Sequence, residues 1–184
     1  EMERNPGQKQ MVTSQIQRFL DNDGIKSDKN YELVKKLLLL KVRVEQERTD
    51  FTEMLIWLFM QNHQFNMALI QAKALDKRIT LDGEGVYDLA ESFLDKEYFE
   101  LAVDAYDYVI AKGKQNPLFV EANINKLYAL TKSMTIKNQD VSILDKEYKK
   151  IVTDLGIKKE TVILLSNYAH FKAFYLHDLS AAES

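Results

Sequence analysis

The chain has 184 residues, of which 46% are hydrophobic and 29% charged, a composition typical of a folded protein and not of a disordered one. A net charge of -3 disfavours nucleic-acid binding. Because cysteine is absent, the chain has no disulfide, thiolate metal site or thiol nucleophile. Only 2 Pro and 6 Gly occur, and so few helix breakers favour an all-α fold.

Two helices are predicted before residue 50. Met11, Ile16, Phe19 and Leu20 form a short amphipathic pattern that ends at residues 21–24. A longer helix is predicted from about residue 28 to residue 46. Its apolar residues lie nearly all round the helix, so we expect both of its sides to be covered.

From residue 50 onward the sequence predicts short antiparallel helix pairs. The expected ranges are 50–61 with 64–78, 84–95 with 98–112, 117–132 with 142–155, and 160–176, with a further start near 179. Asp82 is the expected N-cap of the helix at 84, and Pro117 is placed in a first helical turn. Residues 133–141 are expected to form a long loop, and this loop and lengthened helices account for an insertion in the third pair. The longest unbroken apolar run, 54–60, is far too short to span a bilayer, so direct membrane insertion is not expected.

A repeat with a period of 34 residues links two of these pairs. The residues that recur at this spacing are Phe59, Phe65 and Ala68, and then Phe93, Phe99 and Ala102. A fixed period of this size is typical of a solenoid, in which each unit buries its apolar face against its neighbours. The period therefore predicts a protein that binds other proteins and has no catalytic activity.

The repeated positions resemble the tetratricopeptide repeat (TPR) family. The best copy has Val86, Leu89-Ala90, Phe93, Ala102 and Tyr106, and closes at Pro117. The resemblance implies a right-handed superhelical solenoid of antiparallel helix pairs, with repeats at about 50–82, 83–116, 117–158 with the insertion, and a truncated 159–184. Residues 1–49 are then expected to pack on or cap the array. Pentatricopeptide repeats are the alternative, but they bind RNA and tend to be basic, which fits this acidic chain badly.

Three short sequence segments, at 71–78, 108–113 and 173–176, are similar to segments from the interior of large TPR-containing proteins of bacterial cell envelopes. This resemblance implies a segment of a longer protein and a periplasmic or cell-envelope location, with a cytoplasmic location as the alternative.

In the TPR family the first helix of each pair lines a concave groove that binds peptides. The groove candidates implied here are Glu53, Trp57, Gln61, Glu84, Tyr87, Glu91, Asp95 and His170, with Met60, Leu94, Ser166, Ala173 and Phe174 as further positions. The TPR carboxylate clamp needs Lys, Arg and Asn at such places, and Glu53, Tyr87 and Glu91 stand there instead. Binding of a chaperone C-terminus is therefore not expected.

Two features of the groove leave alternatives open. Trp57 either packs between repeats or forms part of a binding surface, because tryptophan is common at interaction hot spots. Residues 82–107 hold nine acidic residues and one basic residue, Lys96. This acidic segment either attracts a basic partner surface or simply forms a solvated face.

The histidines offer no clear chemistry. His170 and His177 are seven residues apart, whereas metal ligands on one helix are usually three or four apart. We therefore predict no catalytic, cofactor-binding or metal-binding residues. The predicted function is a non-catalytic protein–protein interaction scaffold or adaptor. The alternatives are a self-assembly module of a larger envelope complex and a helical accessory domain of an enzyme.

Overall fold

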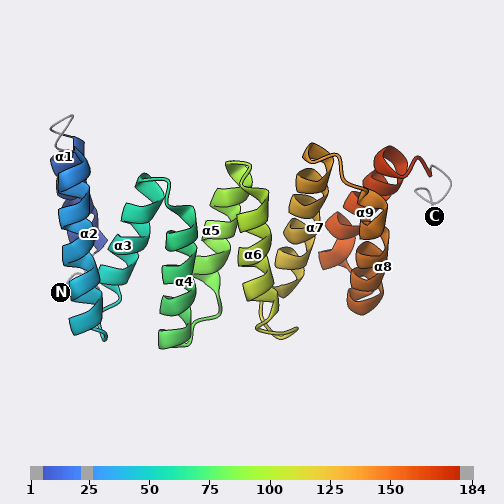
Figure 1. Cartoon of the computed structure of the whole chain (residues 1–184). Helices are drawn as coiled ribbons and strands as arrows, with labels where there is room; N and C mark the ends of the chain where they lie inside the picture. Colours follow the sequence, from blue (N-terminus) through green and yellow to red (C-terminus); the bar gives the residue numbers. More distant parts are fainter. Residues whose placement is uncertain (1–5, 22–26, 179–184) are drawn as a thin grey trace. The chain divides into compact units, whose positions relative to one another are not determined.

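The computed structural model describes residues 6–21 and 27–178, and every secondary-structure element within these ranges is a helix (Figure 1). The predicted all-α class is thereby confirmed. The helices are α1 (Pro6–Asp21), α2 (Ser27–Val44), α3 (Asp50–Gln61), α4 (Phe65–Ile79), α5 (Glu84–Asp95), α6 (Phe99–Ile110), α7 (Phe119–Ile136), α8 (Leu144–Leu155) and α9 (Val162–Tyr175), with the short 3₁₀ turns η3 (Val141–Ile143) and η4 (Lys159–Thr161).

The chain divides into two compact units. Unit 1 is 1–79 and unit 2 is 80–184. In unit 1, α1, α2 and α3 share a core that includes Tyr31, Leu38, Leu55 and Phe59. In unit 2, α5 packs on α6 and α6 packs on α7, and a further core lies between α7, α8 and α9. The helices before residue 50 therefore share a core with the first predicted repeat.

The 34-residue period of the sequence is also a period of the backbone. Helix α5 begins 34 residues after α3 (50 to 84), and α6 begins 34 residues after α4 (65 to 99). The two turns match as well, because His63 and Glu97 have positive φ values of 55° and 62°. In each turn the next N–H donates 2.8 Å back to a phenylalanine carbonyl, from Gln64 to Phe59 and from Tyr98 to Phe93. This is the Schellman arrangement that ends many helices.

The repeated apolar residues occupy equivalent buried positions. Phe59 and Phe93 are buried, and Ala68 and Ala102 are fully buried where α3 meets α4 and α5 meets α6. An alanine at such a contact lets two helix backbones approach closely, while a phenylalanine fills the space beside it. The sequence period therefore marks a repeated packing unit.

One prediction for α2 is wrong for the described residues. Its two sides were expected to be covered, but only the side that carries Tyr31 and Leu38 is buried. The opposite side carries Leu33, Leu37 and Leu40, which are exposed. The physical reason is that α1 and α3 both pack on the same side of α2.

The start of α5 also differs from the prediction. Gly83 is the N-cap, with φ 88°, so Asp82 is not. The Lys112 ammonium donates 2.5 Å to the Leu81 carbonyl, and the Asn116 amide donates 2.6 Å to the Asp82 carbonyl. These bonds fix the loop before α5, so the residue that joins it to the helix must adopt a positive φ. Glycine does so without strain, which explains why Gly83 stands there.

The third pair is lengthened mainly within its helices. Helix α7 has 18 residues where α5 has 12, and it includes residues 133–136 of the predicted loop. The remaining loop, 137–140, leads into η3. Pro117 lies in the turn before α7 and not in its first turn, since the helix begins at Phe119. The predicted helix start near 179 lies outside the described residues.

The positive φ of Glu97 gives a first test of the repeated turn. A side chain in the left-handed region is strained, whereas glycine is not, so Glu97→Gly is expected to raise the free energy of unfolding by about 0.5–1 kcal/mol. Urea denaturation followed by circular dichroism measures the change. Asp88→Gly, at an exposed helical position of α5, is the control and should lower stability. Equal destabilisation by the two substitutions would contradict the turn geometry.

Candidate functional site

Five of the predicted groove residues lie on helices α5 and α9 of unit 2, and α7 lies between these helices: Glu84, Tyr87, Glu91, Asp95 and His170. Glu91 of α5 accepts a hydrogen bond from the Tyr106 hydroxyl. The Asn125 amide of α7 donates 2.8 Å to the same carboxylate oxygen of Glu91 and 3.0 Å to the Tyr87 hydroxyl. The rings of Tyr87 and Tyr106 meet edge to face, with centroids 5.7 Å apart. Glu91 is thus held in place by its neighbours.

The two tyrosines of this network stay protonated at neutral pH. Burial, and then the Glu91 carboxylate, raises the pKa of the Tyr106 hydroxyl well above its usual range. Burial and the charges of Glu91 and Glu121 raise the pKa of Tyr87 in the same direction. Protonated phenols can donate hydrogen bonds, so the Tyr106 hydroxyl serves as a fixed donor to Glu91. The network fastens α5 and α6 to α7 through polar contacts.

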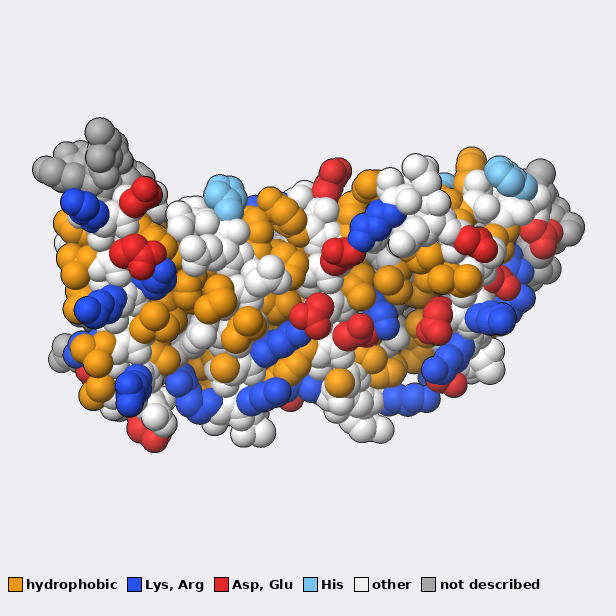
Figure 2. All heavy atoms as spheres, in the orientation of Figure 1, with side chains coloured by type: hydrophobic (Ala, Val, Ile, Leu, Met, Phe, Trp, Pro, Cys, Tyr) orange, Lys and Arg blue, Asp and Glu red, His pale blue; other side chains and the backbone are white. Residues whose placement is uncertain are grey.

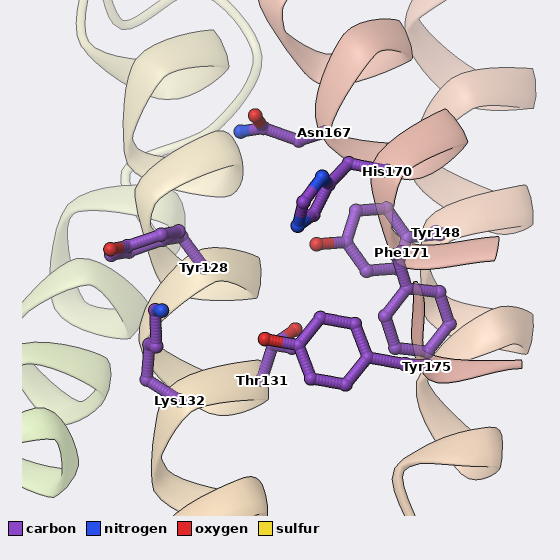
Figure 3. Close-up of a pocket in the computed structure, with 8 residues that line it drawn as sticks. All are labelled: Tyr128, Thr131, Lys132, Tyr148, Asn167, His170, Phe171 and Tyr175. Carbon is purple, nitrogen blue, oxygen red and sulfur yellow. The ribbon is translucent and has the colours of Figure 1, made fainter. Parts of the chain in front are cut away.

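A pocket opens between α7, α8 and α9 of the same unit (Figure 3). Its volume is about 80 Å³. A water molecule needs roughly 10–15 Å³ on the same measure, so the pocket has room for a side chain of several heavy atoms. The residues that line it are Tyr128, Thr131 and Lys132 of α7, Tyr148 of α8, and Asn167, His170, Phe171 and Tyr175 of α9.

The floor of the pocket is aromatic and firmly packed. Tyr148 and Phe171 are buried and stack with ring centroids 4.9 Å apart, and Tyr175 stacks on Phe171 at 5.7 Å. On its other side Tyr148 stacks on Tyr168 at 5.1 Å, and the Tyr168 hydroxyl donates 2.6 Å to Asp145. Burial raises the pKa of the Tyr148 hydroxyl. These contacts fix the shape of the floor.

The mouth of the pocket carries polar and exposed groups. The Lys132 ammonium lies 5.4 Å from the Tyr128 ring, and His170 lies against the exposed ring of Phe174 with centroids 4.4 Å apart. In Figure 3 the imidazole of His170 points from α9 toward α7. Lys132 and the Asn167 amide can donate hydrogen bonds, and the aromatic floor adds the hydroxyls of Tyr148 and Tyr175, which point into the pocket in Figure 3. Such a site suits an apolar side chain whose peptide backbone or carboxylate accepts hydrogen bonds at the mouth.

Tyr128 and Lys132 occupy the same register as two predicted groove residues. Tyr87 and Glu91 stand ten and six residues before Glu97, the residue with positive φ at the end of α5 (97 − 87 and 97 − 91). Tyr128 and Lys132 stand ten and six residues before Asn138, which has φ 51° at the end of α7. The turn at Asn138 also repeats the hydrogen bonds of the earlier turns.

Sequence reasoning missed Asn125, Tyr128 and Lys132 because the third pair matches the repeat motif poorly. The signal that could have found them is Asn138, since asparagine tolerates the left-handed conformation that ends a helix. Aligning Asn138 with Glu97 would have given Tyr128 the repeat position that Tyr87 occupies in the preceding pair. The same count places Glu53 and Trp57 of unit 1 at the equivalent positions before His63.

In unit 1, two predicted groove residues lie beside α1. Trp57 and Gln61 of α3 line a shallow open hollow together with Thr13, Ser14, Gln17 and Arg18 of α1. Trp57 is half-buried and packs against the core of unit 1. It therefore contributes both to packing and to a partly open surface, and Glu53, on the same helix, is half-buried.

The acidic segment of residues 82–107 is partly neutralised within unit 2. The Asp107 carboxylate lies 2.6 Å from the Lys126 ammonium of α7, and Glu100 pairs with Lys137. Glu84 and Asp95, two further groove candidates, are exposed at the two ends of α5. Binding of a partner by any of these predicted residues stays a prediction.

Residues 6–21 and 27–178 contain neither a membrane-spanning helix nor a metal-binding cluster. None of the helices is both long and apolar enough to cross a membrane. No group of three or more histidine or acidic side chains among the described residues is placed to hold a metal ion.

Comparisons with protein-family models, curated proteins and solved structures found no match to this chain. The resemblance to the TPR family therefore stays a prediction, based on the 34-residue period and on the repeated turn.

Proposed function

We propose that the chain is a TPR-like helical-repeat scaffold that binds a segment of another protein without catalysis. The observation that supports this most is the pocket between α7 and α9, whose aromatic floor and polar mouth suit a peptide side chain. In TPR-like geometry α5, α7 and α9 are the first helices of their pairs, and first helices line the peptide groove.

The binding surface in this proposal is the α5–α7–α9 face, which consists of Glu91, Asn125, Tyr128, Lys132, Asn167 and His170. The predicted groove residue Tyr87 is buried and supports this face from within. The hydrogen bonds from Asn125 to Tyr87 and Glu91 join α5 to α7 along this face. A face that is organised before binding loses little conformational entropy when a ligand binds. The network of Glu91 thus serves to hold the surface in shape, while the pocket beside it takes the ligand.

The partner segment in this proposal carries an apolar residue for the pocket and basic residues near it. The exposed Glu84, Asp88 and Asp95 of α5 supply the acidic charge that would attract such residues. Because these carboxylates are exposed, their contribution is expected to weaken as the salt concentration rises.

A random-peptide library displayed on phage and selected against the whole chain tests the proposal. Tyr128→Ala is expected to weaken the binding of a selected peptide by about tenfold or more, since exposed aromatic residues beside a pocket are frequent hot spots. Isothermal titration calorimetry with the synthetic peptide measures the change. The matched control is Tyr98→Ala, because Tyr98 is 42% exposed and Tyr128 is 43% exposed, and Tyr98 lies at the start of α6.

The proposal requires Tyr128→Ala to weaken peptide binding much more than Tyr98→Ala does. If the selected peptides bound Tyr128→Ala as well as the parent chain, or lost as much affinity with Tyr98→Ala, the α5–α7–α9 face would not be the binding surface.

A further inference from the structure

Helix α2 of unit 1 carries an apolar stripe on the side that faces away from the core. The stripe consists of Leu33, Leu37, Leu40 and Val44, whose side chains are between 50% and 69% exposed. Spacings of four, three and four residues return a helix to nearly the same side, so the four side chains lie within about 60° of one another around the axis. We call them the α2 stripe.

The orientation of α2 is fixed from the other side. Tyr31 and Leu38 are buried in the core that α2 shares with α1 and α3. The Tyr31 hydroxyl also lies 2.9 Å from the side-chain oxygen of Gln64 in a hydrogen bond. Because these contacts fix the rotation of α2, the helix cannot turn its stripe inward without breaking the core. In Figure 2 hydrophobic side chains lie over α2, at the left of the view, with Lys and Arg side chains among them.

Basic residues border the α2 stripe, mainly along one of its edges. Lys29, Lys36 and Arg43 follow one edge of the stripe, and Lys41 stands at the other. Successive residues turn by about 100° around a helix, which places these four side chains within about 90° of the centre of the stripe. The acidic Glu32 lies further round the helix, where it pairs with Lys35 at 2.5 Å. Lys41 is already paired with Glu45 at 2.6 Å, so a partner that covers the stripe would meet positive charge mainly along the edge of Lys29, Lys36 and Arg43.

The width of the stripe favours a helix as its partner over a lipid surface. The stripe is one side chain wide, as in the seam between two helices of a coiled coil. Helices that lie in a membrane surface have a broader apolar face that they bury in the acyl region. Here Lys36 and Lys41 bound the stripe closely on its two sides.

We propose that the α2 stripe is the docking site for an amphipathic helix of a partner protein that has leucine-type residues along one line and Asp or Glu along the edge that meets Lys29, Lys36 and Arg43. A second copy of α2 would bring Lys and Arg against Lys and Arg, so like charges disfavour self-pairing. The stripe lies in unit 1, and the proposal does not depend on the α5–α7–α9 face.

A pair of synthetic peptides tests the charge preference on the full chain. Both peptides are amphipathic helices with leucine along one line, and they carry either Glu or Lys along both edges. Fluorescence anisotropy of the labelled peptides is measured as the chain is added. The Glu peptide is expected to bind at least about tenfold more tightly than the Lys peptide, and its affinity should fall as salt is raised.

Substitutions then locate the binding. Leu37→Asp is expected to weaken binding of the Glu peptide by about tenfold or more, because it puts a negative charge at the centre of the stripe. Leu39→Asp is the matched control, since Leu39 is a 42% exposed leucine of the same helix that lies off the stripe. The double variant Lys36→Glu with Arg43→Glu should shift the preference toward the Lys peptide. Circular dichroism verifies that each variant is folded.

Three results would overturn the proposal. The first is equal binding of the two peptides, or equal loss with Leu37→Asp and Leu39→Asp. The second is absence of peptide binding together with binding to phosphatidylserine vesicles that Leu37→Asp abolishes, which would assign the stripe to a membrane surface. The third is a dimer in sedimentation experiments that Leu37→Asp dissociates, which would assign it to a second copy of the chain.

Discussion

Phe93→Ala is expected to lower the free energy of unfolding by about 3–5 kcal/mol, the largest effect of any substitution considered for this chain. Phe93 is fully buried within α5, at the position that Phe59 occupies in α3. The loss combines the transfer free energy of the ring with the cost of the cavity that remains. Urea denaturation followed by circular dichroism at 222 nm, where helices absorb, measures it.

Phe174→Ala is the control for Phe93→Ala. Phe174 is an exposed phenylalanine of α9, so its removal should change stability by no more than about 0.5 kcal/mol. Phe59→Ala should be about as costly to unit 1 as Phe93→Ala is to unit 2. A small effect at Phe93, comparable with that at Phe174, would mean that the repeated phenylalanines are not core positions.

Ala102→Leu is expected to destabilise the chain by about 1–3 kcal/mol, because the larger side chain overpacks the contact between α5 and α6. Ala102 is fully buried at this contact, and Ala68 is its equivalent between α3 and α4. The denaturant midpoint of the variant, compared with that of the parent chain, measures the effect.

Ala111→Leu provides the comparison for Ala102→Leu. Ala111 is an exposed alanine at the C-terminal end of α6, so a leucine there meets no facing helix. Its midpoint should stay close to that of the parent chain. An unchanged midpoint for Ala102→Leu would show that the 34-residue register has been assigned to the wrong helix contact.

The helix pairs could be predicted where apolar spacing and turn residues agree. Helix α3 spans 50–61 and α5 spans 84–95, the ranges that the sequence predicts. In both helices buried residues recur at helical spacing and the flanking residues are polar, so local pattern and tertiary packing favour the same structure.

The end of α7 could not be predicted from the same rules. Polar residues from Ser133 onward indicate a loop, yet the helix continues to Ile136. The hydroxyls of Thr131 and Thr135 donate to carbonyls four residues earlier, at 2.8 and 2.7 Å, so these polar side chains are satisfied inside the helix. Because the predicted helix ended at Lys132, its end could not be aligned with the end of α5. The repeat position of Tyr128, and with it the pocket, was therefore missed.

The exposure of α2 could not be predicted because burial depends on a partner as well as on the helix itself. An apolar pattern all round a helix indicates that burial is favourable on every side. It does not show which side the other helices of the chain will cover. In the structure α1 and α3 both pack on the same side of α2, so the α2 stripe on the other side stays exposed.

The distribution of aromatic residues between the two units has a spectroscopic consequence. Trp57, the one tryptophan of the chain, packs against the core of unit 1, whereas eight of the nine tyrosines follow residue 80. Indole emission selected by long-wavelength excitation therefore comes from unit 1 alone, while far-ultraviolet dichroism sums the helices of both units. Two optical signals recorded on one unlabelled sample thus follow different parts of the chain, and any separation between their unfolding curves measures how independently the two units melt.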